Sequence, residues 1–393
     1  MTKNFRSIMF VIVALTLILA ACGTPASVPA TEASNQGSAA TAGPTEVPTL
    51  PPGSVQINGA GATFPLPVYT AWTYAYQYVD PSVVINYQGI GSGGGKKGII
   101  DGTIDFAGSD SLLKDPDEYT AGKDLQMYPM LAGAVAVIYN IKYAKDVPAD
   151  VKLPALVLDR QTLVDIYNGK VNKWNDAAIL VLNPDYKDYL PAAGITAVHR
   201  SDGSGTTEIF TKSLTSFSTD WTAGGASAVE WPVDKAGNGV GGKGNQGVAA
   251  AVINTANSIG YVELSFAISN GLSYASFVNK AGKTVVPNAK SVESAMTDFA
   301  TAFSDRLTAT IVDAPGDGSY PITGYTYLIL HTTTMTDCVK AGKLLDYIQW
   351  SLTDAGASSA AAKLGYSVLP GDIRDQVLAK LGEVTCDGQP VLK

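Results

Sequence analysis

The amino-acid sequence predicts an α/β protein in which strands alternate with helices and pair in parallel. Short β-like runs are repeatedly followed by helical runs, an alternation typical of parallel sheets. Several of the connections are short turns rich in glycine, serine and threonine. The chain has 393 residues, 46% of them hydrophobic, so it is long enough for two domains of ordinary size with ample core.

The pattern of apolar residues places the elements along the chain. Pro65 and Pro67 suit the first turn of a helix, where a missing backbone N–H costs little, so a helix is expected from about residue 66 to 79. The glycine-rich run 89–98 and the glycine loop 237–247 each lead into a helix. Further helices are expected within residues 161–174 and at 208–214, 340–352 and 372–381. The expected strands are residues 55–59, 83–87, 104–108, 127–139, 195–198, 260–263 and 322–330.

The N-terminus has the pattern of a targeting segment. Lys3 and Arg6 precede an apolar run, residues 8–21, that is too short to span a bilayer. Residues 19–22 read Leu-Ala-Ala-Cys, which resembles the lipobox of bacterial lipoproteins. This resemblance implies a signal peptide at residues 1–21 and a lipid on Cys22. An ordinary secretory signal with an incidental cysteine is the alternative.

The segment that follows the signal peptide cannot build a core. It consists largely of Thr, Pro, Ala, Ser, Gly and Glu without an apolar period, so residues 22–53 are expected to form a disordered tether. Export also makes pairing of the two remaining cysteines, Cys338 and Cys386, the expected outcome. Two buried free thiols are the alternative.

The turn that follows residues 195–198 is the most informative motif. A strand there passes through a glycine-rich turn into a helix, which leaves backbone N–H groups free at the helix start to bind an anion. The turn also carries the guanidinium of Arg200 and the hydroxyls of Ser204 and Thr206. Asp202 is close enough in sequence to orient Arg200. This combination of groups favours a tetrahedral oxyanion as the ligand. The net charge of −8 argues separately against nucleic acid as a partner.

Two other turns share this design of strand, glycine–hydroxyl turn and helix start. One contains Thr63 and Phe64, and the other contains Ser92. Any one of the three turns is also explained by a serine or threonine that caps its own helix. Three of them in one chain favour convergence on one anion, which several hydrogen bonds of about 1.5–3 kcal/mol each would hold.

Asp110 indicates which tetrahedral anion the site would bind. A carboxylate repels an anion unless the anion carries a proton that the carboxylate can accept. Hydrogen phosphate carries such a proton at neutral pH and sulfate does not, so Asp110 favours phosphate. The alternatives are that Asp110 caps a helix beginning at Ser111 or faces solvent.

Enzymatic templates fit the sequence poorly. Residues 89–94 match GxGxxG, but no acidic residue is well placed for a ribose. Residues 237–243 match GxxxxGK, but Gly244 replaces the Ser or Thr that would hold magnesium. Residues 203–205 do not belong to a GxSxG motif, because position 202, where the motif has its first glycine, is Asp202. The two histidines are not spaced as metal ligands. We therefore expect no catalytic residues, no cofactor and no metal.

With these residues assembled, the chain resembles the phosphate-binding subunit of bacterial high-affinity phosphate ABC transporters, a periplasmic-binding-protein family. The resemblance implies a type II fold with two α/β lobes, each a mixed sheet flanked by helices, and two crossovers at a hinge with the ligand in the cleft. Lobe I would comprise residues 54–135 and 320–393, and lobe II residues 136–319. The stretches that carry the resemblance, in family order, are residues 59–65, 87–92, 109–110, 200–206, 241–245 and 259–263.

The resemblance also implies a ligand set and a function. Phe64 and Gly205 would contribute backbone N–H groups, Asp110 would accept the phosphate proton, and Asp202 would hold Arg200 by an ion pair. The implied protein is a monomeric, lipid-anchored receptor on the outer face of the membrane that delivers hydrogen phosphate to an ABC permease. The implied phosphate-binding residues are Thr63, Phe64, Ser92, Asp110, Arg200, Ser204, Gly205 and Thr206.

Two other functions remain open at this point. The first is a receptor of the same fold for another oxyanion such as sulfate or molybdate, against which Asp110 argues. The second is an exported phosphatase or a phosphate-handling surface protein used for attachment. The lack of a metal cluster or nucleophile–base pair in the sequence argues against the enzyme.

Overall fold

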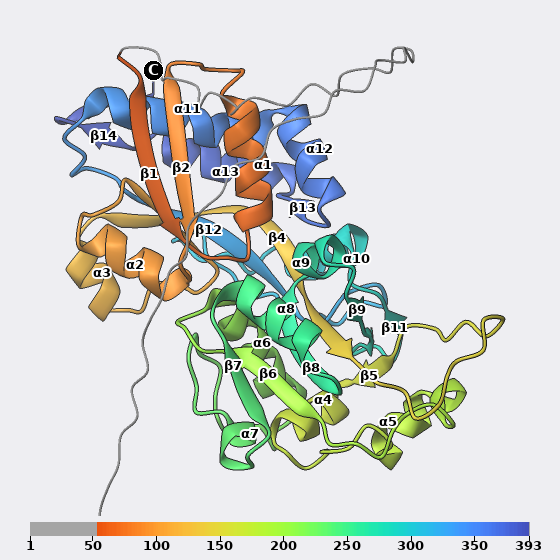
Figure 1. Cartoon of the computed structure of the whole chain (residues 1–393). Helices are drawn as coiled ribbons and strands as arrows, with labels where there is room; N and C mark the ends of the chain where they lie inside the picture. The colour runs from red at the N-terminus through yellow and green to blue at the C-terminus, as the bar shows by residue number, and fades with distance from the viewer. Residues whose placement is uncertain (1–52, 393) are drawn as a thin grey trace, which may run out of the picture. The chain divides into compact units, whose positions relative to one another are not determined.

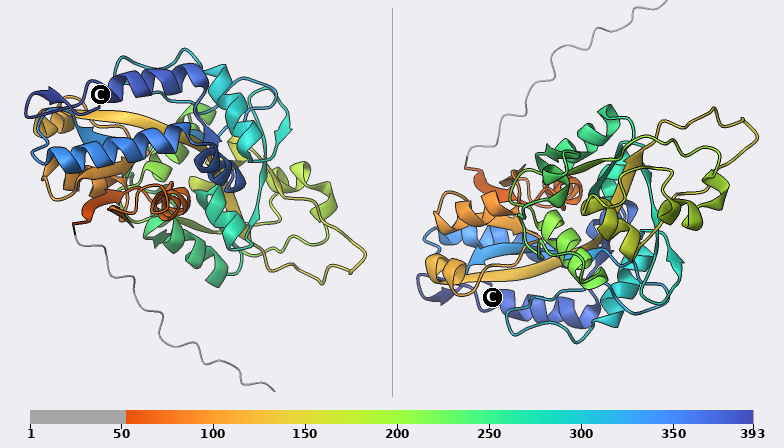
Figure 2. Two further views of the ribbon diagram at one scale, coloured as in Figure 1. Left: turned by 90° about the horizontal axis from the view of Figure 1, so that it is seen from above. Right: turned by 90° about the horizontal axis from the view of Figure 1, so that it is seen from below.

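A computed structural model describes residues 53–392 of the chain, so the predicted signal peptide, Cys22 and almost all of the tether lie outside the described residues. The described part is built on a ten-stranded sheet in the order β2-β1-β3-β12-β4-β8-β6-β7, with β13 and β9 also paired to β4. Within residues 53–392, no helix combines the length and the apolar character needed to cross a membrane. Figure 1 shows that the N-terminal (orange) and C-terminal (blue) elements lie together, apart from the green middle of the chain, and the views from above and below again show the orange and blue elements side by side (Figure 2).

The half of the sheet that belongs to the predicted lobe I is parallel at its outer edge. β1 pairs in parallel with β2 on one side and with β3 on the other. The elements of this region are β1 (Val55–Gly61), α1 (Leu66–Tyr76), β2 (Val83–Gly89), α2 (Ser92–Ile100), β3 (Phe106–Ser109) and α3 (Asp117–Gly122). The predicted strands and the first helix are confirmed, with α1 ending a few residues earlier than expected.

The glycine-rich run that was expected to precede a helix is itself most of α2. A Cβ at Gly95 would lie 2.6 Å from the Cα of Gly61, which no real side chain tolerates. Glycine therefore allows the helix to contact the backbone of β1 directly, and this tertiary packing outweighs the low helix propensity of glycine.

A long central strand, β4 (Leu125–Asn140), runs from one half of the sheet into the other. Its first part pairs antiparallel with β12 (Thr323–His331), and its last part pairs antiparallel with β8 (Ser258–Glu263). The partner changes between Ala134 and Val135, beside the predicted lobe boundary. The mixed sheet that the resemblance implies is therefore confirmed, and the parallel pairing expected from the alternation of strands and helices does not extend to β4, because the chain runs along β4 in one direction and returns along β12 in the other. The division into lobes I and II stays a prediction, and we keep those names for the residue ranges given above.

Lobe II repeats the parallel arrangement. β6 (Thr196–Arg200) pairs in parallel with β8 and with β7 (Gly239–Gly242). The two helices that begin where these strands end are α6 (Gly205–Phe217) and α8 (Gly244–Asn254). Strand β7 lies inside the glycine loop and was not predicted, because an edge strand of three glycines and one valine has no apolar alternation.

Shorter elements complete lobe II. Its remaining strands are β5 (Val157–Asp159), β9 (Ser273–Tyr274), β10 (Ser276–Val278) and β11 (Thr284–Val285). Its remaining helices are α4 (Arg160–Tyr167), α5 (Ala177–Leu182), the 3₁₀ helix η1 (Pro184–Tyr186), α7 (Pro232–Lys235), α9 (Leu264–Ser269) and α10 (Ala289–Asp298).

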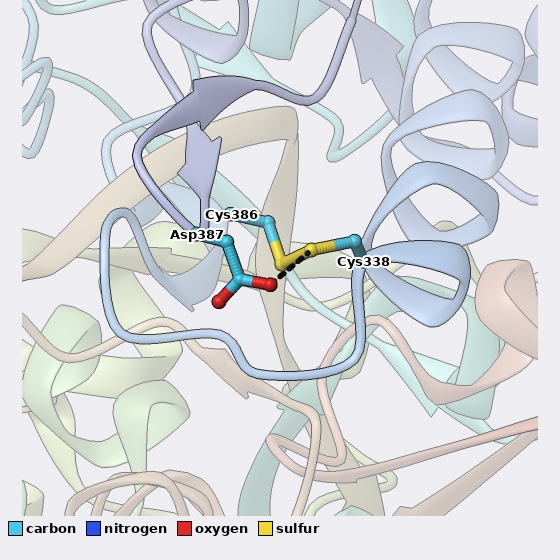
Figure 3. Close-up of side chains that lie close together, drawn as sticks. All are labelled: Cys338, Cys386 and Asp387. Carbon is cyan, nitrogen blue, oxygen red and sulfur yellow. Dashed lines mark hydrogen bonds between the residues drawn. A yellow bond between two sulfur atoms is a disulfide. The ribbon is translucent and has the colours of Figure 1, made fainter.

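The C-terminal segment returns to lobe I and is closed by a disulfide. Cys338, the first residue of α11, is bonded to Cys386 in β14, with their Cα atoms 5.5 Å apart, so the predicted pairing is confirmed (Figure 3). With Asp387 these cysteines form the one group of possible metal ligands found within residues 53–392, and both sulfurs are used in the disulfide. The elements are α11 (Cys338–Thr353), α12 (Ala355–Lys363), β13 (Ser367–Val368), α13 (Gly371–Leu381), β14 (Thr385–Cys386) and β15 (Gln389–Pro390).

Candidate functional site

The candidate site lies where the parallel strands of both lobes end. In lobe I, Thr63 follows β1, Ser92 begins α2 after β2, and Asp110 follows β3. In lobe II, Arg200 is the last residue of β6 and Ser204 is the N-cap of α6. Ends of parallel strands that lead into helix N-termini are the usual place for anion sites in α/β folds, because backbone N–H groups collect there.

Hydrogen bonds between the lobes bring these turns into contact. The Gly205 N–H donates to Ser92 Oγ over 3.1 Å, and the Gly93 N–H donates to the Gly203 carbonyl over 3.0 Å. The predicted ligand side chains are almost completely enclosed, since Asp110 and Arg200 are 5% and 4% exposed and the others less. In this structure the site is therefore closed to solvent.

Arg200 is held by a two-point ion pair. Its Nε donates to Asp202 Oδ1 over 2.7 Å and a terminal nitrogen donates to Oδ2 over 2.5 Å. The Gly244 N–H adds a third bond to Oδ1, over 3.0 Å. Burial raises the pKa of Asp202, but the hydrogen bonds and charge of Arg200 outweigh burial and hold this pKa below its usual value. The guanidinium is thus fixed in orientation while its other terminal nitrogen lies 3.5 Å from Thr206 Oγ1.

Asp110 has one satisfied and one unsatisfied oxygen. Its Oδ1 accepts a hydrogen bond of 2.8 Å from Thr326 Oγ1 on β12. Its Oδ2 is buried and has no hydrogen-bond partner among residues 53–392. Burial raises the pKa of Asp110 to about 7, against the opposing effects of Thr326 and the charge of Arg200, while Glu208 raises it further. A carboxylate oxygen without a donor in an enclosed site can accept a proton from a ligand.

Two alternatives for Asp110 do not hold. The residue is buried, so it does not face solvent. The next helix along the chain, α3, begins at Asp117, so Asp110 does not cap a helix at Ser111. A Cβ at Gly205 would lie 2.6 Å from Asp110 Oδ2, which explains why glycine stands opposite the carboxylate. Asp110 therefore belongs to the interface between the lobes.

The helix-cap alternative holds for one of the three turns. Ser204 Oγ accepts a hydrogen bond of 3.0 Å from the Thr207 N–H and so caps α6. Helices α1 and α2 have no side-chain cap, so Thr63 and Ser92 are not explained in this way. A capping serine still has its own O–H to donate. Ser92 Oγ likewise accepts from two backbone groups, the N–H of Gly205 and the N–H of Asp110 over 3.3 Å.

Phe64 joins the site through its backbone. Its ring is buried and packs edge-on against Tyr366, with ring centroids 6.1 Å apart. Its carbonyl accepts a hydrogen bond of 2.7 Å from the Tyr366 hydroxyl. Phe64 follows Thr63 directly in the chain, and Ser204 directly precedes Gly205. The remaining predicted ligand residues are connected by the hydrogen bonds described in this subsection.

Asn245 and Glu263 were not singled out as site residues from the sequence. Asn245 is fully buried in the first turn of α8 and donates to Thr63 Oγ1 and to Thr206 Oγ1, over 2.8 and 3.1 Å. The turn from β7 into α8 is a fourth strand–glycine–helix connection, and this signal would have found Asn245 had the strand been recognised.

Glu263, the last residue of β8, is a second buried carboxyl group. Its Oε2 accepts from the Ser265 N–H over 2.9 Å and lies 2.8 Å from the Tyr366 hydroxyl, while its Oε1 has no partner among residues 53–392. Burial raises the pKa of Glu263 to about 8, with Ser265 and Tyr366 opposing the shift and Asp110 adding to it. The single Tyr366 proton cannot serve both Glu263 and Phe64, so a protonated Glu263 satisfies this cluster best.

Comparison with known proteins agrees with this architecture. A family model described as a PBP superfamily domain matches residues 30–355. The chain is 38% identical over 327 residues to the phosphate-binding protein PstS of Pasteurella multocida (strain Pm70), covering 82% of this chain and 89% of that protein. It is 37% identical over 328 residues to PstS of Xylella fastidiosa (strain 9a5c), covering 83% and 85%. The X-ray structure of a human phosphate-binding apolipoprotein shares the fold, with a TM-score of 0.65 at 22% identity, covering 85% of this chain and 99% of that chain.

A mixed sheet flanked by helices, with a buried polar site where its parallel strands end, is the fold of the periplasmic binding proteins. The chain belongs to the PBP superfamily and, within it, to the family of PstS phosphate-binding proteins. The named relatives in this family are phosphate-binding proteins.

Proposed function

We propose that this protein binds inorganic phosphate as hydrogen phosphate outside the cytoplasmic membrane and delivers it to an ABC permease for import. The observation that carries the choice of ligand is Asp110 Oδ2, a buried acceptor without a donor, in a site otherwise built from N–H and O–H donors and Arg200. The named relatives are phosphate-binding proteins, and one protein of the same fold is titled a putative phosphate ABC transporter substrate-binding protein.

The proton on the ligand decides between tetrahedral anions. Hydrogen phosphate offers acceptor oxygens to Arg200 and to the hydroxyls, and one O–H to Asp110. Sulfate has no proton at neutral pH, so it would place an unprotonated oxygen against Asp110 Oδ2 and leave that atom unsatisfied. Because the pKa of Asp110 is raised to about 7, the carboxyl group and the bound phosphate would share one proton.

Ligand exchange requires the lobes to separate. The predicted ligand side chains are buried by contacts between lobe I and lobe II, including the bonds from Gly205 to Ser92 and from Asn245 to Thr63. Phosphate would bind to an open form and stabilise the closed one, because only the closed form brings the donors of both lobes onto one anion. The phosphate set in this proposal is Thr63, Phe64, Ser92, Asp110, Arg200, Ser204, Gly205 and Thr206, with Asp202 in support.

Attachment to the membrane by a lipid on Cys22 is a further part of the proposal. It is supported by the sequence alone, through the basic start, the short apolar run and the cysteine that follows residues 19–21. The tether at residues 22–53 would give the folded part reach from the membrane surface to the permease. We propose that the receptor acts as a monomer, since one chain supplies both sides of the site.

Isothermal titration with phosphate, sulfate and arsenate tests the ligand assignment. Phosphate and arsenate, which both carry a proton near neutral pH, should bind, and sulfate should bind at least about 100-fold more weakly because one buried carboxylate contact is lost. Sulfate binding as tight as phosphate binding would contradict the role of Asp110.

Asp110→Asn tests the same role in the protein. Phosphate affinity should fall about 10- to 100-fold, and the preference for phosphate over sulfate should shrink, because an amide nitrogen cannot accept the ligand proton. Asp101→Asn is the matched control, since Asp101 is a half-exposed carboxylate in the same lobe, paired with Lys97. Unchanged selectivity in Asp110→Asn would count against the proton-acceptor argument.

A further inference from the structure

Asn245 lies in α8 and contacts both the turn after β1, in lobe I, and helix α6, in lobe II. Its backbone N–H and side chain both reach Thr63 of lobe I, over 3.0 and 2.8 Å. The other hydrogen of its side-chain amide reaches Thr206 Oγ1 over 3.1 Å. Every polar atom of this fully buried side chain is therefore used.

The orientation of the Asn245 amide is fixed by a backbone group. The Glu263 N–H donates to Asn245 Oδ1 over 2.9 Å. A backbone N–H can only donate, so the atom facing it must be the amide oxygen. The amide nitrogen must then face the two threonines, and it can only donate to them.

This orientation determines what the two hydroxyls can do. A hydroxyl has one donor and two acceptor lone pairs. Thr63 Oγ1 accepts two N–H groups from Asn245, which uses both lone pairs. Thr206 Oγ1 accepts from Asn245 and from Arg200 over 3.1 and 3.5 Å. Each hydroxyl is left with its proton to donate.

We propose that Asn245 is a positioning residue that fixes the hydroxyls of Thr63 and Thr206 as hydrogen-bond donors to the bound anion, one from each lobe. This role rests on the proposed function of phosphate binding. With both hydroxyls held as donors, neither can accept the ligand proton, which is left for Asp110. Because Thr63 contacts Asn245 across the lobes, its hydroxyl acquires this orientation only when the lobes close.

A double-mutant cycle measured by titration with inorganic phosphate tests the proposal. Asn245→Ala should weaken phosphate binding about 10- to 100-fold, since two oriented bonds to a charged ligand are lost. Thr63→Val removes the hydroxyl and keeps a similar shape. If Asn245 acts through Thr63, the double variant should bind at least about threefold more tightly than the product of the two separate losses predicts.

Two further variants separate positioning from folding. Asn245→Asp keeps an oxygen for the Glu263 N–H but accepts from the two threonine hydroxyls, so it should weaken phosphate binding at least about tenfold while the ligand-free protein still unfolds cooperatively. Asn254→Ala is the matched control, because Asn254 is exposed at the end of the same helix and, within residues 53–392, its side chain bonds only to the Ala250 carbonyl of that helix. It should bind phosphate as the unsubstituted protein does.

The outcomes distinguish this role from the function on which it rests. Losses that combine within about threefold of their product, or wild-type affinity in Asn245→Asp, would overturn the role of Asn245 and leave the phosphate receptor intact. No phosphate binding by the unsubstituted protein would overturn the proposed function, and the role of Asn245 with it.

Discussion

In lobe I, the strands β1, β2 and β3 run in parallel and end at Thr63, Ser92 and Asp110. In lobe II, β6, β7 and β8 do the same, and they end at Arg200, at the turn before Asn245 and at Glu263. Each lobe thus offers the ends of three strands to the site, and each provides a carboxyl group whose pKa burial has raised.

The lobes differ in how their charged groups are matched. In lobe II, Arg200 and Asp202 satisfy each other through two hydrogen bonds. In lobe I, Asp110 keeps an oxygen without a partner among residues 53–392. A matched ion pair fixes a donor in place, whereas an unmatched acceptor distinguishes among ligands. We expect affinity to depend mainly on Arg200 in lobe II and selectivity mainly on Asp110 in lobe I.

Loss of the lobe II charge should have the largest effect. Arg200→Ala removes the guanidinium and leaves Asp202 partly buried without its partner, so phosphate affinity should fall on the order of 1,000-fold, equivalent to about 4 kcal/mol. Titration against phosphate measures this loss, with Arg374→Ala as control because Arg374 is partly exposed and, within residues 53–392, forms an ion pair only with Asp375. A loss no larger than that of Asp110→Asn would contradict the division of roles between the lobes.

The buried carboxyl of lobe II should control stability rather than selectivity. The pKa of Glu263 is about 8 in the folded protein against 4.5 normally, so the folded state holds a proton that the unfolded chain releases. The resulting stabilisation is complete below about pH 4.5 and is lost as pH rises through about 8. From pH 5 to 8 the unsubstituted protein should lose roughly 3 kcal/mol relative to Glu263→Gln, at about 1.36 kcal/mol per pKa unit.

Urea unfolding of the ligand-free proteins at several pH values measures this difference. Asp110 titrates in both proteins, so the comparison isolates Glu263. Glu383→Gln serves as control, because Glu383 is exposed on the surface beside Lys380. Parallel pH profiles for the unsubstituted protein and Glu263→Gln would show that the proton resides elsewhere.

A smaller effect should appear in the pH dependence of sulfate binding. Asp110 has a pKa of about 7, so at lower pH it is protonated and can donate to sulfate, while at higher pH it is ionised and repels sulfate. Sulfate affinity should therefore fall about tenfold from pH 6 to pH 8. Titration at constant ionic strength checks this, and the dependence should vanish in Asp110→Asn. An increase of sulfate affinity with pH would contradict the assignment.

Local sequence was sufficient to place residues that lie together in one turn. Arg200, Asp202, Ser204 and Thr206 are within seven residues of one another, and strand, glycine turn and helix start place them without knowledge of the rest of the fold. The positions of the long strands along the chain also followed from apolar runs, but their order in the sheet did not. The ligand roles of these residues, and the lobe boundaries, stay predictions.

The remaining features depend on contacts between distant parts of the chain. Asn245 meets Thr63 across 182 positions, and the environment of Glu263 depends on Tyr366, 103 positions away. Helix α2 formed in a glycine run because Gly95 lies on the backbone of β1. No periodicity or motif within a single segment predicts these contacts, because each contact is with a distant segment that only the fold brings close.

The place where the chain crosses between the lobes has a mechanical consequence. At the predicted lobe boundaries the outgoing segment at Val135 and the returning segment at Ile322 are adjacent, since the Val135 N–H donates to the Ile322 carbonyl over 2.8 Å. Two neighbouring strands joined by a hydrogen bond form a narrow pivot. We expect rotation about this pair of segments to preserve that bond and sliding of one predicted lobe along the other to break it, which would favour a jaw-like motion.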